Sequence, residues 1–321
     1  FCNKLKTIAS FGVKIAAFGD FMSNTETSTV AAMLKFGQTT FESQGIHFGH
    51  GTTCAWDEAV CLLSFALDLP PSPGRSVLAQ VLSMDEQLKI KALFERRISE
   101  RIPAPYLTGQ AWFCGLPFIV DQRVIVPRSP IGALIGERFQ PWCKTQPIQI
   151  LDLCTGGGCI GIACAYAFQD AQIVLTDISA DAIAVATMNI AGHDVGDRVT
   201  AVVSDLFAGL DSEKRFDLIV SNPPYVDLDD LASMPEEYQY EPALALASGN
   251  DGLDFTRRLL REAEHYLTQD GVLVVEVGNS SQALGLAFPK VSFVWIDFDE
   301  GDGGVFMLTR EELVEHRESF Q

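Results

Sequence analysis

The sequence predicts an α/β fold, with a mostly parallel sheet of the Rossmann-like type, preceded by a small helical domain. Three observations predict this fold. From Ile148 onward, apolar segments of strand length alternate with helical patterns. A glycine-rich run directly follows the first of these segments, and the chain from about Trp56 to Ser99 shows apolar residues at helical spacing. Near-continuous apolar strands that alternate with helices are typical of a parallel sheet covered on both faces.

The composition limits the class of partner. The chain has 321 residues, of which 47% are hydrophobic and 20% charged, as in a soluble globular protein with enough residues for two domains. Its formal net charge is −19. We expect no stable nucleic-acid binding, because phosphate binding needs clustered Lys and Arg. The acidic excess favours a basic partner, such as a basic protein.

Cysteine usage and hydropathy indicate the setting. The eight cysteines have no paired Cys-x-x-Cys spacing, so we expect neither a zinc site nor a disulfide framework, and a reducing, cytoplasmic setting fits. No stretch reaches the roughly 18 apolar residues of a membrane span. No clear small-residue cleavage site follows the apolar start, so we expect no signal peptide. Residues 1–30 lack an initiator Met and are interpreted as an extension of uncertain origin.

The remaining chain divides into three parts. Residues 31–107 are predicted to form a helical substrate-recognition domain, because "WDEAVCLLSFALDL" and "SMDEQLKIKALFERRISER" repeat apolar residues every three to four positions. Residues 108–130 alternate aromatic and polar residues around Gly109, Gly115 and Pro117, which predicts a β-hairpin connector. Residues 131–321 contain the α/β pattern.

Within this last part, five segments predict parallel strands: "IQILDLC", "QIVLTD", "VTAVVSD", "FDLIVSN" and "GVLVVEVG". Helical patterns such as "DAIAVATMNIAG" and "LDFTRRLLREAEHYL" lie between them. The tail differs, because "VSFVWIDF" and "VFMLT" have the spacing of a hairpin. We expect this pair to add antiparallel strands at one edge of the sheet.

The first predicted strand leads into "GGGCIG", in which Gly156, Gly158 and Gly161 match the dinucleotide-binding fingerprint. Asp177 ends the next strand, 21 positions after Gly156, a spacing that suits a carboxylate on the ribose hydroxyls of a nucleoside. These residues alone leave open a nicotinamide-dependent oxidoreductase, or a tight turn without a ligand.

Further polar residues stand at the ends of the other strands. Asp152 lies just before the glycine loop, where it can meet a ligand ammonium group, and Asp205 ends the third strand as a candidate acceptor for an adenine amine, with Leu206 against the ring. "NPPY", residues 222–225, ends the fourth strand. Each acid alone is compatible with a helix N-cap. The row along the carboxyl edge of the sheet favours S-adenosylmethionine, which offers an amine, a ribose diol and an adenine.

The segments "ILDLCTGGGCIGIACA", "LTDIS", "SDLF" and "SNPPYVD" resemble the class I methyltransferases that modify planar amide or amine nitrogens. With "EPALALASGNDGLD" they resemble the protein N(5)-glutamine methyltransferases of the translation apparatus. "DLCTG", "VPRSPIGALI", "WFCG" and "GVFMLT" are similar to the branch that modifies large-subunit ribosomal protein three. The release-factor branch usually has a "PRPET"-like run and a Gly at the position of Cys154. Gly157, where Ser or Thr is commoner, is a departure that we expect to loosen the loop.

This resemblance implies roles for particular residues. An amide nitrogen is a poor nucleophile, and two acceptors that fix its hydrogens can aim it at a sulfonium methyl group. Asn222 and Pro223 would be those acceptors, with Tyr225 flanking the slot, so the implied catalytic set is Asn222, Pro223, Pro224 and Tyr225. Arg128 and Glu241 are candidates for the substrate cleft. The implied cofactor-binding residues are Asp152, Cys154, Thr155, Gly156, Gly158, Asp177, Asp205, Leu206 and Asn222.

Several alternatives stay open at this point. A release factor is an alternative protein substrate, and a nucleic-acid amine methyltransferase could use the same "NPPY", because adenine N6 is also a planar conjugated amine. A nicotinamide-dependent oxidoreductase would not explain Asn222 to Tyr225. His47 and His50 have loose metal-ligand spacing without a companion acid or Cys cluster, so no metal is expected. Cys154, Cys159 and Cys164 are interpreted as small buried residues on different sides of a helix.

Overall fold

The computed structural model describes residues 28–298 and 301–321, without the side chains of residues 301 and 302. It divides the chain into two compact units, Phe1–Thr108 and Gly109–Gln321. The extension predicted at residues 1–30 lies almost entirely outside the described residues. The division falls between the predicted helical domain and the predicted hairpin, so the hairpin belongs to the second unit. None of the helices in the described ranges is both long and apolar enough to span a membrane.

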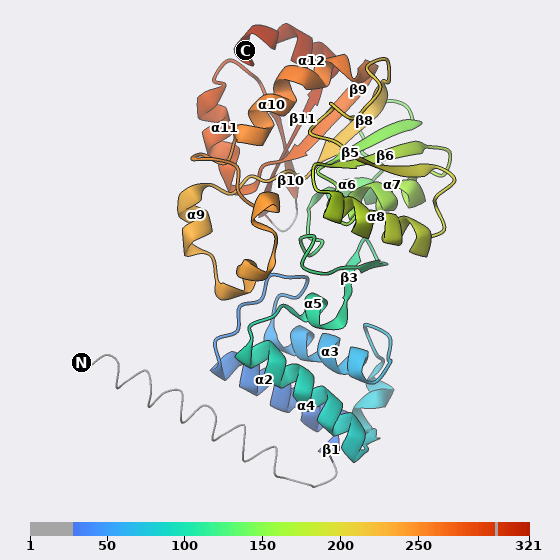
Figure 1. Ribbon diagram of the computed structural model, residues 1–321, viewed down its shortest axis with the longest axis vertical. Helices are drawn as coiled ribbons and strands as arrows, with labels where there is room; N and C mark the ends of the chain where they lie inside the picture. The colour runs from blue at the N-terminus through green and yellow to red at the C-terminus, as the bar shows by residue number, and fades with distance from the viewer. Residues whose placement is uncertain (1–27, 299–300) are drawn as a thin grey trace, which may run out of the picture. The chain divides into compact units, whose positions relative to one another are not determined.

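The first unit is a small helical body (Figure 1). The segments that the sequence predicts to be helical contain the helices α3 and α4, and α4 begins with a capping box of Ser83 and Glu86. Gly37 lies under the Phe94 ring, since a Cβ at residue 37 would come within 2.6 Å of it. The elements are β1 (Ser28–Thr29), α2 (Val30–Ser43), α3 (Ala55–Ala66), η1 (Arg75–Ala79), β2 (Val81–Leu82), α4 (Met84–Ser99) and α5 (Ala104–Thr108).

The second unit begins with the antiparallel hairpin β3 (Gln110–Phe113) and β4 (Leu116–Ile119) and the helix α6 (Ile131–Gly136). Its main sheet has seven strands in the order β10-β11-β9-β8-β5-β6-β7. The strands are β5 (Gln149–Leu153), β6 (Gln172–Asp177), β7 (Val199–Val203), β8 (Phe216–Ser221), β9 (Leu267–Glu276), β10 (Val294–Phe298) and β11 (Gly301–Thr309).

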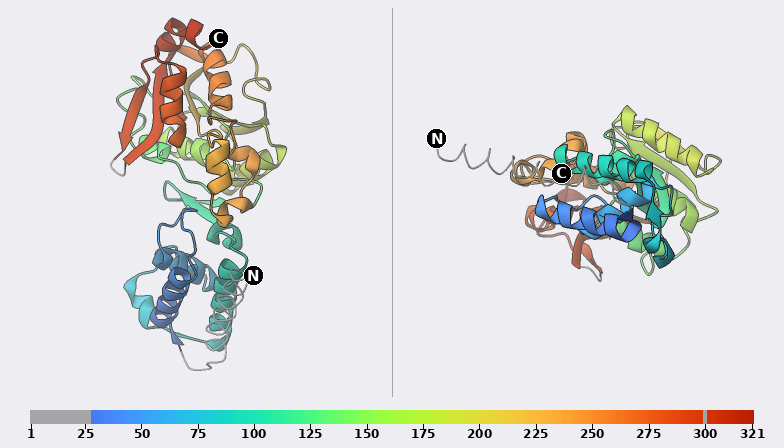
Figure 2. Two further views of the ribbon diagram at one scale, coloured as in Figure 1. Left: turned by 90° about the vertical axis from the view of Figure 1, so that its left-hand side faces the viewer. Right: turned by 90° about the horizontal axis from the view of Figure 1, so that it is seen from below.

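The pairing confirms the predicted fold class. β5 is parallel to β6 and β8, β6 to β7, and β8 to β9. β11 is antiparallel to both β9 and β10, so the tail adds the expected antiparallel pair at one edge (Figure 2, left). The longer helices are α7 (Cys159–Ala167), α8 (Ala180–Gly192), α9 (Leu228–Ser233), α10 (Asp254–Glu262), α11 (Ser281–Ala287) and α12 (Arg310–Glu315). Single 3-10 turns are η2 (Glu236–Tyr240), η3 (Ala243–Ala245), η4 (Ala263–His265), η5 (Gly278–Ser280) and η6 (Arg317–Ser319).

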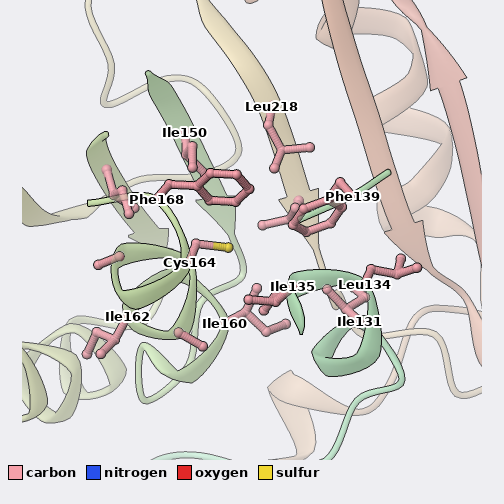
Figure 3. Close-up of a cluster of buried hydrophobic side chains, with 14 of the residues drawn as sticks. Ile131, Leu134, Ile135, Phe139, Ile150, Ile160, Ile162, Cys164, Phe168 and Leu218 are labelled. Carbon is pink, nitrogen blue, oxygen red and sulfur yellow. The ribbon is translucent and has the colours of Figure 1, made fainter. Parts of the chain in front are cut away.

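Helices cover both faces of the sheet, and a separate apolar cluster fills each face. One cluster joins α6, α7 and α8 to the strands; Figure 3 shows Ile150 and Leu218 on the strands near Phe168 and Phe139. The other joins α10, α11 and α12 to the opposite side chains of the same strands, such as Leu151 and Ile219. This alternation explains the unbroken apolar runs of the sequence, because the central strands β5, β6 and β8 are buried on both sides.

The strand order determines where a ligand can bind. From β5 the chain adds β6 and β7 on one side and then returns to add β8 on the other side of β5. In open α/β sheets, ligands bind outside the carboxyl ends of the strands at such a reversal. The glycine loop follows β5, and the Asn-Pro-Pro-Tyr segment follows β8, so the fold brings both predicted motifs to this point.

Candidate active site

The loop after β5 forms a tight left-handed turn. Cys154, Gly156 and Gly158 have φ angles of +57°, +54° and +86°, and the backbone N–H of Thr155 donates to the Thr176 carbonyl of β6 at 2.9 Å. Glycine adopts positive φ without steric cost, which explains two of these positions. The α7 helix begins at Cys159, so Cys154 lies in the loop and the expectation that all three cysteines share one helix is wrong for it.

Gly157, which we expect to loosen the loop, is contacted by the neighbouring helix α8. The side-chain amide of Asn189 on α8 donates to the Gly157 carbonyl at 2.8 Å. An added Cβ at residue 157 would meet its nearest neighbours at 3.6 Å or more, so the site would also accept a small side chain. The Asn189 bond holds the loop from outside the glycine run.

Asp152 holds the loop from below. Its Oδ2 accepts from the Thr155 hydroxyl at 2.6 Å and from the Gly161 N–H at 2.9 Å, and the residue is fully buried. Burial raises its carboxyl pKa from 3.8 to about 7. Its Oδ1 has no hydrogen-bond partner within the described part of the chain. Asp152 therefore supports the loop, and its contact with a ligand ammonium group remains a prediction.

Asp177 connects the loop to the end of β6. Its Oδ2 accepts from the Gly156 N–H and its Oδ1 from the Ser179 N–H, both at 2.9 Å. Burial raises its carboxyl pKa, although these backbone donors oppose the shift. The carboxylate is thus held beside the glycine loop, where the sequence places the acceptor for a ribose.

A cavity of about 180 Å³ opens at these strand ends. The predicted residues on its wall are Cys154, Gly156, Asp177, Asp205, Leu206 and Asn222. The described cavity wall does not include the predicted residues Asp152, Thr155 and Gly158. Asp152 lies behind the loop, whereas Thr155 and Gly158 are part of it. It does include residues that the sequence did not single out, namely Arg123, Ile178, Leu244, Phe255 and Arg258.

Asp205 has a partner that the sequence pattern did not reveal. Arg258 of α10 donates to both of its carboxylate oxygens at 2.9 Å, and both side chains are 46% exposed. If the adenine amine donates to the Asp205 carboxylate, as the sequence predicts, that carboxylate accepts from both the adenine and Arg258. No local signal predicts this pair, because its members are separated by 53 residues.

The Asn-Pro-Pro-Tyr segment stands between two cavities. Asn222 and Pro224 line the first cavity, whereas Asn222, Pro223 and Tyr225 line a second one of about 200 Å³. Asn222 is therefore on the wall of both. Its side-chain nitrogen donates to the Arg128 carbonyl at 3.4 Å, a bond that uses the donor end of the amide and leaves the oxygen to accept from a ligand.

Arg128 and Glu241 form an ion pair at the wall of the second cavity. The two Arg128 terminal nitrogens donate to the two Glu241 oxygens at 2.5 and 2.6 Å, and the Val126 N–H donates to the same carboxylate at 2.9 Å. Arg128 also lies over the Tyr238 ring, 5.4 Å from its centroid. Arg128 lines the second cavity, as the cleft interpretation expects, whereas Glu241 is buried behind it.

Comparisons with known proteins identify the family of the chain. Residues 140–234 match the family model "Methyltransferase small domain". The chain is 46% identical, over 91% of its length and 94% of the relative, to the "Ribosomal protein uL3 glutamine methyltransferase" of Francisella tularensis subsp. tularensis. It is also 46% identical, over 90% of its length and 97% of the relative, to the protein of the same name from Neisseria gonorrhoeae.

Solved structures resemble it less closely. The crystal structure of a ribosomal protein L11 methylase from Lactobacillus delbrueckii subsp. bulgaricus is 20% identical and covers 55% of this chain and 74% of that chain, with a TM-score of 0.37. A similarity at this level says nothing about the substrate of this chain.

Proposed function

The chain belongs to the family of the ribosomal protein uL3 glutamine methyltransferases, and from this premise we propose that it methylates the side-chain amide nitrogen of a glutamine in ribosomal protein uL3. It is an S-adenosylmethionine-dependent methyltransferase. The observation that carries the proposal is the position of Asn222 on the wall of two cavities at once. Such a residue can touch a cofactor on one side and a substrate amide on the other.

The first cavity fits S-adenosylmethionine. Asp177 offers a carboxylate for a ribose diol, and Ile178 and Leu206 offer apolar walls for an adenine. The buried Asp152 Oδ1 lacks a partner among the described residues, which suits an indirect contact with a ligand ammonium group through a bound water. The cofactor, when bound, supplies a methyl group on a positively charged sulfur, so the chain itself needs no metal to provide the electrophile.

The second cavity would hold the glutamine amide. The lone pair of an amide nitrogen is delocalised into the carbonyl, which makes the nitrogen a weak nucleophile. In our proposal, the Asn222 side-chain oxygen and the Pro223 carbonyl accept its two N–H groups, aim the nitrogen toward the first cavity and stabilise the positive charge that grows on it. Pro223 and Pro224 keep this acceptor pair rigid, because proline fixes φ and has no N–H.

The charge of the chain supports a basic protein as substrate. With 42 acidic and 23 basic side chains, it attracts basic ribosomal proteins over long distances in solution. The helical unit would recognise the folded substrate, while the second cavity accepts the glutamine. We place the reaction in the cytoplasm, in keeping with the free cysteines of the described chain, and expect no stable binding to nucleic acid or membrane.

Labelled S-adenosylmethionine and purified protein test the proposal against four acceptors: isolated uL3, a release factor, naked RNA and free glutamine. We expect label on one glutamine of uL3, located by peptide mass spectrometry, and little on the other three. Equal labelling of a release factor would move the substrate assignment to the sister branch. Label in RNA alone would overturn glutamine methylation, and NADH binding without S-adenosylmethionine binding would indicate an oxidoreductase.

A further inference from the structure

The last residue of β9 and the turn that follows it hold Tyr225 at three places. The Tyr225 hydroxyl donates to Glu276 Oε1 at 3.0 Å, and the Ser280 hydroxyl donates to the Tyr225 carbonyl at 2.7 Å. Between them, Gly278 lies against the ring, because a Cβ at residue 278 would come within 2.6 Å of Tyr225 Cε2. With its φ of +46°, Gly278 makes this close approach without strain. Hydroxyl, ring and backbone of Tyr225 are therefore all fixed by residues 276–280.

Glu276 also reaches a second segment of the cavity wall. Its Oε2 accepts from the Ser129 hydroxyl at 2.6 Å, and Ser129 directly follows Arg128, which lines the second cavity. Glu276 itself is 4% exposed and is not among the residues that line either cavity. One buried carboxylate thus connects the two sides of the substrate cavity, Tyr225 after β8 and Arg128–Ser129 before α6, from behind.

We propose that Glu276 is a positioning residue for methyl transfer, which fixes the Tyr225 ring and the Arg128–Ser129 segment at the wall of the substrate cavity. This inference rests on the proposed glutamine methylation, because it assigns Tyr225 to the substrate slot. A side chain that acts from behind the wall affects the orientation of the amide, and a misplacement of about 1 Å costs up to roughly a hundredfold in rate.

The protonation state of Glu276 determines how firmly it holds Tyr225 and Ser129. An ionised carboxylate accepts from both hydroxyls, whereas a protonated one carries a donor on one oxygen and weakens one of the two bonds. Burial raises the Glu276 pKa to about 7, although Ser129, Tyr225 and Arg128 oppose the shift. On β11, the neighbour of Glu276 is the uncharged Val305. The proposed positioning therefore improves as pH rises through neutrality.

Steady-state kinetics with uL3 at pH 6 to 8.5 test this role. At pH 8, Glu276→Leu should lower kcat by on the order of tenfold to a hundredfold, and Glu276→Gln, which keeps one acceptor, should lose less. The rise of kcat near pH 7 should disappear in both variants, while S-adenosylmethionine affinity stays unchanged. Glu264→Gln is the matched control, since Glu264 is equally buried but pairs with Arg317 at 2.6 Å and is absent from both cavity walls. It should leave the pH profile intact.

A double-mutant cycle with Tyr225→Phe tests whether Glu276 acts through the tyrosine hydroxyl. The double variant should be no slower than the slower single variant, because both changes remove the same hydrogen bond. Losses that multiply, or a pH profile that survives in Glu276→Gln, would overturn the proposed role.

A spectroscopic measurement separates this inference from the proposed function. The chain has six tyrosines, so Tyr225 labelled with ¹³C at Cζ can be assigned by the signal that Tyr225→Phe removes. This signal should shift with a midpoint near pH 7 in the wild-type protein and stay constant in Glu276→Gln. A wild-type protein that methylates no glutamine would defeat the proposed function alone. A Tyr225 signal that is the same in wild type and Glu276→Gln at every pH would defeat the Glu276 contact whatever the substrate.

Discussion

Arg128 and Glu241 are 113 residues apart in the chain, yet their side chains meet as a two-point ion pair beside the second cavity. The Glu241 carboxylate is fully enclosed, while 29% of the Arg128 side chain is exposed. The pair joins the segment before α6 to the segment before η3, and it holds Arg128 at the wall of the second cavity. The shape of the substrate cavity therefore depends on a contact between segments that are far apart in sequence.

Breaking this pair should lower stability more than breaking an exposed one. Arg128→Met leaves the buried Glu241 carboxylate without its main donor, and we expect the free energy of unfolding to fall by roughly 1–3 kcal/mol. Arg123→Met is the control in the same unit: its partner Asp121 lies at 2.6 Å, but the two side chains are 38% and 45% exposed, so the loss should stay under about 1 kcal/mol. Urea unfolding measures the stability of both variants. Equal losses would show that the Arg128–Glu241 pair stabilises the fold no more than the exposed Arg123–Asp121 pair does.

Asp177→Ala should weaken cofactor binding at least tenfold. The change removes a charged acceptor, worth roughly 1.5–3 kcal/mol per hydrogen bond, and also frees the Gly156 N–H that Asp177 now engages. Asp181→Ala is the control, because Asp181 is exposed on α8 and does not line the cavity. Isothermal calorimetry with S-adenosylmethionine gives both affinities. An unchanged affinity in Asp177→Ala would remove this carboxylate from the cofactor site.

Asn222→Ala should separate chemistry from cofactor binding. We expect S-adenosylmethionine affinity within a few-fold of wild type but methyl transfer slower by on the order of a hundredfold or more, the usual scale for a lost polar group at the reacting atom. The loss should appear in kcat at saturating uL3. Asn279→Ala, which removes another amide from the second cavity, should cost far less. A variant with half the wild-type turnover would exclude Asn222 from the mechanism.

Asp152 should make the protein less stable as pH rises toward 7. Its pKa is about 7 in the folded chain and 3.8 ordinarily, so the folded state keeps a proton that the unfolded state releases between these values. The resulting loss is at most about 1.4 kcal/mol per pH unit. Asp152→Asn still offers an oxygen to Thr155 and Gly161, and it should gain stability over wild type from pH 5 to 7.

Urea unfolding at several pH values measures the effect of Asp152, and Asp121 should show a pH dependence of the opposite sign. Hydrogen bonds from Arg123 lower the Asp121 pKa below its ordinary 3.8, so wild type should keep its small advantage over Asp121→Asn above this value and lose it as pH falls further, through the folded pKa. An Asp152→Asn advantage that does not change between pH 5 and 8 would contradict the raised pKa.

Methylation of uL3 should depend on salt. Attraction between an acidic enzyme of net charge −19 and a basic protein is screened beyond a Debye length of about 8 Å at physiological ionic strength. The ratio kcat/KM for isolated uL3 should therefore fall clearly as salt rises from 20 to roughly 300 mM, while S-adenosylmethionine affinity changes little. A kcat/KM that is insensitive to salt would show that recognition does not use this field.

The sequence alone determined the features whose signal is local. The central strands of the parallel sheet, β5, β6 and β8, are short apolar runs, because burial on both faces requires apolar side chains at nearly every position. The glycine loop, Asp177 and the Asn-Pro-Pro-Tyr segment are readable for a similar reason, since their chemistry depends on the backbone of a few consecutive residues. Their common edge then follows from strands that run parallel.

Tertiary structure alone decided which side chains these residues meet. Tyr225 and Glu276 are 51 residues apart, and Asp205 and Arg258 are 53 apart, so no periodicity in the chain marks either pair. Asp152 shows the same limit at one position. The sequence predicts that Asp152 lies at a strand end, but not that it lies behind the loop, where α7 packs Gly161 directly against it. Alternate side chains of a strand face opposite sides of the sheet, and only the packed helices determine what each side meets.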